Sequence, residues 1–164
     1  MINHQLRLIM NNSLVIMLST FLSVILTIST FPLGYFSPDW IFLIIMYWII
    51  AVPSMYNFYV IWLIGIITDV AVGTTLGMNA LLYVLLTFIV KKLYKSLRYF
   101  TVIQQSIIVL ILMVIKITFL LWIDAMLNSD IYSTSMYWTT LTSALVWPII
   151  FFSLRHMRRR YNII

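Results

Sequence analysis

Residues 91–98 read Lys-Lys-Leu-Tyr-Lys-Ser-Leu-Arg, a basic run in the middle of a chain that is otherwise strongly apolar. Nine of the ten Lys and Arg residues lie in this run, in the C-terminal tail or near the N-terminus: Arg7, Lys91, Lys92, Lys95, Arg98, Arg155, Arg158, Arg159 and Arg160. Short loops rich in Lys and Arg stay on the cytoplasmic side of a membrane. We therefore expect all three clusters to be cytoplasmic anchors on anionic lipid, with an even number of membrane crossings between each pair.

The composition excludes a water-soluble globular protein. Of the 164 residues, 63% are hydrophobic and 9% are charged, whereas soluble domains carry about 25% charged residues. The net charge of +6 is explained by membrane anchoring, so we expect lipid contacts and no nucleic acid. Cysteine is absent, which excludes disulfides and thiolate chemistry. We expect a single membrane domain over residues 1–164, without a cofactor or a metal.

Six apolar segments are separated by proline, glycine or charged residues: 14–31, 40–52, 56–72, 77–90, 103–127 and 138–154. Backbone polar groups inside a bilayer need internal partners, so each segment should be helical. The sequence thus predicts an all-α polytopic bundle of six transmembrane helices with both termini in the cytoplasm, the first helix being a retained signal-anchor. Two spans followed by a re-entrant pair before Lys91 satisfy the same charge rule and remain an alternative.

Some of the expected helices are short. The second segment has thirteen residues before Pro53, about 20 Å of helix against a bilayer core of about 30 Å. We expect a break at Pro53 that leaves two short crossings, and a fourth helix that extends into Lys91–Tyr94. Asp39 and Asp130 should lie in outward-facing loops.

The first segment carries Ser19, Ser23 and Thr27 at four-residue spacing. This places small polar groups on one helix face, where membrane helices approach each other closely and share weak hydrogen bonds. The spacing favours helix packing, and a polar lining for a substrate is the alternative.

In the third segment Gly65, Asp69, Gly73 and Gly77 recur every four residues. Two glycines beside an acid on one face would let another backbone approach the acid. One interpretation is a glycine packing face that ends in a turn at Gly73–Gly77. The other is a functional acid that couples to a partner or a ligand, because intramembrane charges usually mark a pair or a pathway.

Lys116 is the one basic residue inside an apolar segment. Asp69 and Lys116 each lie thirteen residues into their segments, and both segments start from the cytoplasmic side, so each charge should sit about 20 Å deep. We therefore expect an intramembrane ion pair between Asp69 and Lys116.

Signatures of catalysis are missing from the sequence, which has no H-E-x-x-H, no G-x-S-x-G and no phosphate loop. We therefore expect that the protein is not an enzyme. In the last segment Pro148 follows Trp147, which predicts a kink that neighbouring helices accommodate.

Several stretches resemble the family of the rod shape-determining membrane protein MreD. They are Phe36-Ser37-Pro38-Asp39-Trp40, residues 47–53 from Tyr47 to Pro53, residues 65–77 from Gly65 to Gly77, Gln104-Gln105 and Val146-Trp147-Pro148. The spacing Asp69-x3-Gly73-x3-Gly77 is the most specific of these. Lys116 is not a position that we associate with the family.

The resemblance implies a non-enzymatic scaffold of the cell-wall elongation machinery in the bacterial inner membrane. Implied partners are an MreC-like bitopic protein, an MreB-like filament, a RodA-like glycosyltransferase and a class B penicillin-binding protein. It also implies a fold like that of the substrate-binding subunits of energy-coupling-factor transporters. A small-molecule-binding transporter subunit is therefore the alternative function, although such a subunit needs a roomy pocket with convergent polar groups.

Overall fold

The computed structural model describes residues 2–29, 34, 36–53, 56–127 and 133–161, with side chains from Leu14 onward. Within these residues the chain forms six α-helices, with a short 3-10 turn before the last of them. Their bounds are α1 Ile2–Ser29, α2 Trp40–Ala51, α3 Phe58–Val72, α4 Met78–Leu97, α5 Val102–Leu127, η2 Thr134–Met136 and α6 Tyr137–Arg160. The chain is thus all-α, as the apolar segments predict.

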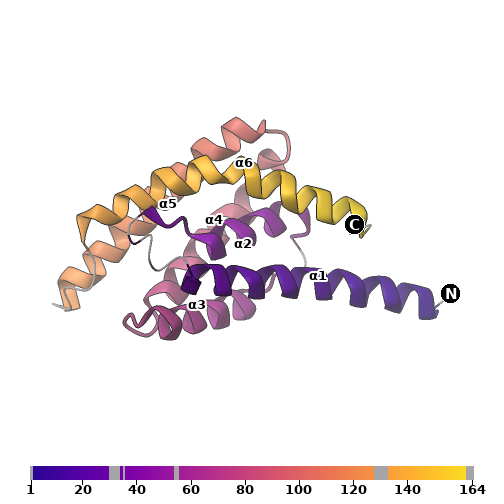
Figure 1. The fold of residues 1–164 in the computed structure, drawn as a ribbon, viewed down its shortest axis with the longest axis horizontal. Coiled ribbons are helices and arrows are strands. Elements are labelled where there is room, and N and C mark those ends of the chain that lie inside the picture. The colour runs from indigo at the N-terminus through magenta and orange to yellow at the C-terminus, as the bar shows by residue number, and fades with distance from the viewer. Residues whose placement is uncertain (1, 30–33, 35, 54–55, 128–132, 162–164) are drawn as a thin grey trace.

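Helix α2 lies at the centre of the bundle and contacts α1, α4 and α6. Its residues Ile41 to Ala51 are all buried. Helices α3 and α4 pack as one antiparallel pair, and α5 and α6 as another. The start of α1 and the end of α6 lie at the same end of the bundle in Figure 1, and the cytoplasmic placement of both termini stays a prediction.

Side chains bond the backbone at both ends of α2: Asp39 at its start and Arg98 at its end. At the start, the Asp39 side chain accepts the backbone N–H of Phe42 at 3.0 Å, which satisfies one of the unpaired donors of the first turn. At the end, the Arg98 guanidinium donates to the carbonyl oxygens of Ile50 and Ala51, each at 2.7 Å. These caps stabilise a helix that is only about 18 Å long.

The predicted helix boundaries agree with the structure in most places. The break at Pro53 is confirmed, since α2 ends at Ala51 and α3 begins at Phe58. The fourth helix extends past the apolar stretch to Leu97, and α6 continues through Pro148 to Arg160, arching along the bundle in Figure 1. The first helix begins at Ile2 rather than at residue 14, because no proline or glycine interrupts the residues before Leu14.

Two helical stretches of the described residues are long and apolar enough to cross a membrane alone: Val102–Leu127 and Thr134–Arg160, with mean hydropathies of 2.7 and 1.3. Three shorter apolar helices are Leu14–Ser29, Trp40–Ala51 and Phe58–Val72. The six crossings therefore stay a prediction.

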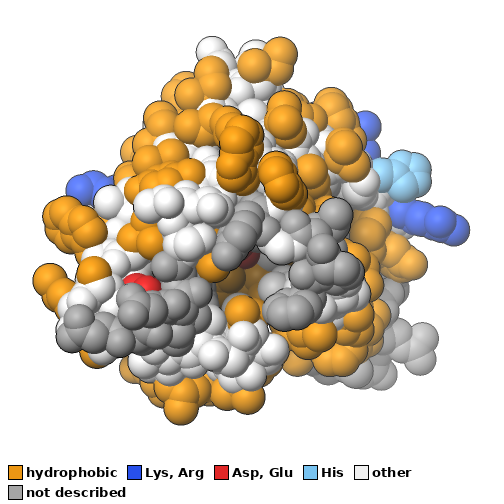
Figure 2. All heavy atoms as spheres, turned by 60° about the vertical axis from the view of Figure 1, so that its left-hand side comes forward, with side chains coloured by type: hydrophobic (Ala, Val, Ile, Leu, Met, Phe, Trp, Pro, Cys, Tyr) orange, Lys and Arg blue, Asp and Glu red, His pale blue; other side chains and the backbone are white. Residues whose placement is uncertain are grey.

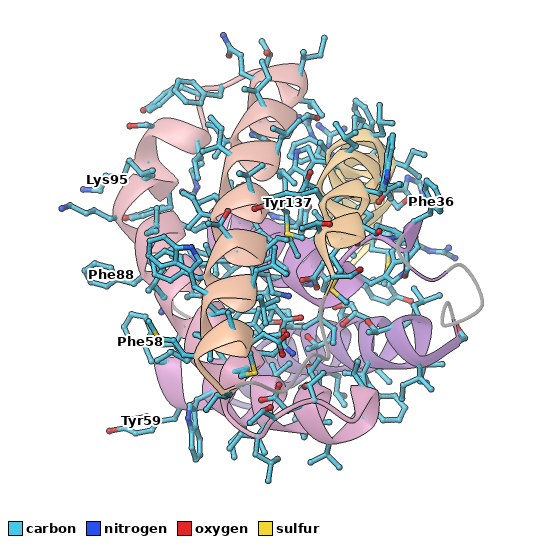
Figure 3. The ribbon with its side chains drawn as sticks, turned by 90° about the vertical axis from the view of Figure 1, so that its left-hand side faces the viewer. Phe36, Phe58, Tyr59, Phe88, Lys95 and Tyr137 are labelled. Carbon is cyan, nitrogen blue, oxygen red and sulfur yellow. The ribbon has the colours of Figure 1, made fainter. Side chains whose placement is uncertain are left out.

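The surface is largely hydrophobic. Figure 2 shows a face dominated by apolar side chains, with Lys and Arg only at its margins. In Figure 3, Phe58, Tyr59 and Phe88 project from α3 and α4 on one side of the bundle, and Lys95 projects further along α4. Tyr59 is 82% exposed and Phe88 60% exposed. Water would not stabilise such a surface, whereas lipid or apolar partner helices would.

Gly65 sets the close approach of α3 to α4. A Cβ atom at this position would lie 2.2 Å from the Ala80 Cα atom and 2.7 Å from its nitrogen, both of which are backbone atoms. Small residues allow membrane helices to come this near.

We predict that Gly65→Ala destabilises the protein by about 1–3 kcal/mol, because the α3 and α4 backbones must separate. The measurement is the thermal midpoint of the detergent-purified protein, followed by size-exclusion chromatography. Ala71→Val, at an exposed position of the same helix, is the control and should leave the midpoint nearly unchanged. Equal midpoints for the two variants would contradict the close approach.

Candidate functional site

Asp39 lies at the start of α2 and bonds every other member of a buried polar cluster. One carboxylate oxygen, Oδ1, accepts the N–H of Phe42 and also the hydroxyl of Tyr83, both at 3.0 Å. The backbone N–H of Asp39 donates to the Ser143 hydroxyl at 3.0 Å. Asp39 therefore joins α2 to α4 and α6.

Lys116 completes this cluster from α5. Its ammonium lies 2.5 Å from Asp39 Oδ2, and both side chains are 7% exposed. The same ammonium lies 4.5 Å from the centroid of the Tyr83 ring and 3.5 Å from its hydroxyl oxygen. We call Asp39, Tyr83, Lys116 and Ser143 the ion centre. Four helices, α2, α4, α5 and α6, each contribute one residue or cap to it.

The expected pairing of Lys116 with Asp69 is wrong. Lys116 pairs with Asp39, an acid that the hydropathy pattern places in an outward loop. Asp69 on α3 and Lys116 on α5 are expected at the same depth, but equal depth does not make two residues neighbours. Helix α4 packs against both α3 and α5. The missed signal is the position of Asp39 directly before an apolar run, which is typical of a helix N-cap.

Asp69 is instead the acceptor that holds the start of α4. Its Oδ1 accepts the Thr74 hydroxyl at 3.0 Å, the Asn79 backbone N–H at 3.0 Å and the Asn79 side-chain amide at 2.9 Å. Its Oδ2 accepts the Gly77 N–H at 2.8 Å. Asp69 is fully buried. Four neutral donors and the positive end of the α4 dipole therefore stabilise this carboxylate.

Gly73 and Gly77 form the turn that brings these donors round Asp69. Gly73 ends α3 with φ +73° and Gly77 precedes α4 with φ +95°, both in the left-handed region. These two glycines thus lie in a turn, whereas Gly65 packs against α4. The structure therefore agrees with the interpretation of Gly65, Gly73 and Gly77 as a packing face that ends in a turn. A partner-coupling role for Asp69 remains a hypothesis.

Two small polar residues of α1, Ser19 and Thr20, contact α2 and the connection after it. Ser19 and Ser23 are buried and Thr27 is partly buried. The Ser19 hydroxyl accepts the Trp48 indole N–H at 2.8 Å. Thr20, which the four-residue spacing misses, shares a 2.5 Å hydrogen bond with the Tyr56 hydroxyl. The Ser23 and Thr27 hydroxyls donate to carbonyl oxygens of α1 itself, at 2.6 and 2.8 Å. The Ser19 contact supports helix packing, and the role of the whole face stays a prediction.

Trp147 lies on α6, one residue before Pro148, and is fully buried. Its indole N–H donates to the Gln105 side-chain oxygen at 3.3 Å. The Gln105 amide nitrogen in turn donates to the Leu97 carbonyl at 2.9 Å. Gln105 therefore fixes the α4–α5 corner against α6.

The basic residues have more than one structural role. Besides Arg98, Lys91 also donates to a backbone carbonyl, that of Tyr56, and its ammonium lies 4.7 Å from the Phe58 ring centroid. The exposed members are Lys92, Lys95, Arg98, Arg155, Arg159 and Arg160, while Lys91 and Arg158 are partly buried. The Arg7 side chain and Asp130 lie outside the described residues. Anchoring on lipid therefore stays a prediction.

Within the described residues, no group of three His, Cys, Asp or Glu side chains is placed to hold a metal ion. Among the buried ionisable residues, Asp39 and Asp69 make hydrogen bonds to helix termini, and Lys116 bonds Asp39. The geometry of both clusters is that of structural cross-links between helices. It defines a helical bundle that internal polar groups hold together and whose surface is largely apolar.

Comparison with known proteins gives the family. The model of the rod shape-determining protein MreD matches residues 5–157, so the chain belongs to the MreD family and has a part in rod-shape determination. One relative is the rod shape-determining protein MreD of Haemophilus influenzae (strain ATCC 51907 / DSM 11121 / KW20 / Rd). It is 27% identical over 141 residues, which cover 85% of this chain and 87% of the relative. No solved structure matches the chain, so the expected likeness to energy-coupling-factor subunits stays a prediction.

A double-mutant cycle tests the ion centre. We expect Lys116→Met or Asp39→Asn alone to destabilise the protein by about 3–5 kcal/mol, because each leaves the other charged group buried without its partner. Combining the two should be less harmful than the sum of the single effects. The measurement is the thermal midpoint in detergent. Lys116→Met combined with Asp69→Asn is the control cycle and should be nearly additive.

A separate test addresses Asp69. We predict that Asp69→Asn lowers stability by about 1–3 kcal/mol, since an amide offers one acceptor oxygen to donors that bond two. Asn79→Ala should act in the same direction and be non-additive with it, because the two residues share two hydrogen bonds. Normal thermal stability of Asp69→Asn with loss of a bound partner would instead support the partner-coupling role.

Proposed function

We propose that this protein is a non-catalytic membrane scaffold of the bacterial cell-wall elongation complex. It would cross the inner membrane six times, with both termini in the cytoplasm. Its partners would be an MreC-like bitopic protein, an MreB-like filament, a RodA-like glycosyltransferase and a class B penicillin-binding protein. Membership of the MreD family supports this role.

The observation that carries the proposal is that the buried polar groups of the ion centre bind one another. Asp39, Tyr83, Lys116 and Ser143 are at most 9% exposed, and hydrogen bonds link them in one cluster. A substrate-capture subunit needs polar groups that converge on a ligand. Here they converge on each other, which favours a rigid body that presents its outside to partners.

The outside of α3 supports the same role. Tyr59, Leu63 and Val70 are 82%, 53% and 67% exposed, respectively, although they are apolar. A single transmembrane helix of a bitopic partner can pack on such a face through van der Waals contacts.

Co-purification and photo-crosslinking test the scaffold. We expect the tagged protein from native membranes to bring down an MreC-like bitopic protein. A photo-reactive residue at Val70 should crosslink to a partner, whereas one at Leu82, which is 1% exposed, should not. Depletion of the protein should convert rods to spheres, and wild-type expression should restore them.

A transporter subunit would give the opposite results. It would co-purify with an ATPase module, and its depletion would impair uptake of a small molecule while cells remained rod-shaped. An unrelated polytopic protein with the same tag controls for unspecific capture. Rod shape after depletion would rule out the scaffold.

A further inference from the structure

The α4–α5 corner, residues 98–101, displays apolar side chains on the outside of the bundle. Tyr99 is 90% exposed, the largest exposed fraction among the large hydrophobic side chains of the described residues. Phe100 beside it is 41% exposed, and Ile103 in the first turn of α5 is 74% exposed. Adjoining apolar groups of this kind mark a surface that something other than water covers.

Hydrogen bonds hold the backbone of this corner in place. Arg98 donates to two carbonyl oxygens at the end of α2, each at 2.7 Å. The Gln105 amide nitrogen donates to the Phe100 carbonyl oxygen at 3.4 Å. The Thr101 N–H donates to the Gln104 side-chain oxygen at 2.9 Å, and the Gln104 N–H donates to the Thr101 hydroxyl at 3.4 Å, which is a capping box. A backbone held in this way keeps the apolar side chains of the corner outside the bundle.

The exposed face of α4 changes from apolar to basic before the corner. Phe88 is 60% exposed, and Lys92 and Lys95 are exposed on the turns that follow. Figure 3 shows Phe88 and Lys95 on the same side of the bundle. Lys92 lies five residues before the end of α4 at Leu97, about 8 Å along the helix. Since the headgroup layer is about 5–8 Å thick on each side of the hydrocarbon, the corner lies about one headgroup layer beyond Lys92.

The exposed face of α5, in contrast, stays apolar up to the corner. Ile103, Ile107 and Ile111 follow one another at four-residue spacing and are 74%, 56% and 52% exposed. The helix has 26 residues, about 39 Å. At the average tilt of about 20° it still exceeds a hydrocarbon core of about 30 Å by about 6 Å. Because the lysines of α4 mark the boundary at this end, the excess places the first turn of α5 beside the headgroups.

We propose that the α4–α5 corner lies in the headgroup layer of an anionic bilayer, with Tyr99, Phe100 and Ile103 against lipid. Tyrosine suits this layer because its ring is apolar and its hydroxyl is polar. Lys92 and Lys95 extend their apolar stems along the helix and place their ammonium groups near lipid phosphates. The apolar stripe of α5 continues into the corner, so one lipid leaflet covers both, whereas a cytoplasmic protein would cover the corner alone. The proposal rests on the six crossings proposed above, which bring this corner to a membrane surface.

Spin labels measure the depth of the corner. The chain has no cysteine, so one introduced cysteine labels a single position of the full-length protein in vesicles of phosphatidylglycerol and phosphatidylcholine. The label reports its accessibility to oxygen, which concentrates in lipid, relative to a water-soluble nickel chelate. We expect the ratio for Tyr99→Cys to lie between the ratio for Ile111→Cys, on the exposed stripe of α5, and the ratio for Arg160→Cys, at the exposed end of α6.

Charge removal tests the part played by the lysines. Lys92→Gln with Lys95→Gln should shift the ratio at Tyr99→Cys toward that of water in phosphatidylglycerol vesicles, but not in phosphatidylcholine alone. Arg159→Gln with Arg160→Gln removes the same charge from α6 and should leave the ratio unchanged. An equal shift by the two pairs would indicate a general effect of net charge and would contradict the role of the lysines.

Other outcomes overturn the proposal. A ratio at Tyr99→Cys equal to that of Arg160→Cys would place the corner in water, and one equal to that of Ile111→Cys would place it in the hydrocarbon. Maleimide labelling of Tyr99→Cys that is blocked in native membranes but not in vesicles would indicate a protein that covers the corner.

The side of the membrane is measured separately. An impermeant maleimide added to spheroplasts should not reach Lys95→Cys. Reaction there would contradict the six-crossing topology of the proposed function, whereas the depth at Tyr99→Cys would still decide whether the corner lies in a headgroup layer.

Discussion

The contact between Asp39 and Lys116 is the interaction on which the bundle depends. A lysine in the middle of an apolar helix is costly to desolvate, and the acid that meets it is already held by the first turn of α2. One carboxylate thus caps a helix through Oδ1 and binds the ammonium through Oδ2. Tyr83 and Ser143 add α4 and α6 to the same point. The relative positions of four helices are thereby linked to one buried acid.

Helix α2 explains why this acid is buried. The helix is about 18 Å long and its residues from Ile41 to Ala51 are all buried by other helices, so its ends lie where water is scarce. Each end then needs protein partners for its unpaired backbone groups. Asp39 supplies negative charge at the N-terminal end and Arg98 positive charge at the C-terminal end, which are the signs that the helix dipole favours. Asp69 serves α4 in the same way.

The sequence predicts the helices better than their contacts. Hydrophobic segments, Pro53 and the basic run locate six helices, because helix formation in an apolar chain depends on local pattern. The partner of Lys116 depends on which helices are neighbours, and equal depth along α3 and α5 carries no such information when α4 contacts both. Asp39 could have been recognised as an N-cap, whereas the Gln105–Trp147 contact joins residues 42 positions apart and leaves no local signal.

The placement of charge also accounts for the surface. The two acids Asp39 and Asp69 and the intrahelical Lys116 are buried and bonded. The sides of the bundle are therefore left apolar, with exposed groups such as Tyr59 and Val70 on α3. Apolar sides give no hydrophobic driving force in lipid, so any partner must be selected by shape and close packing. The Asp39–Lys116 ion pair and the hydrogen bonds of Asp69 cross-link the helices and so help to keep their arrangement, which is the property that the proposed scaffold would require.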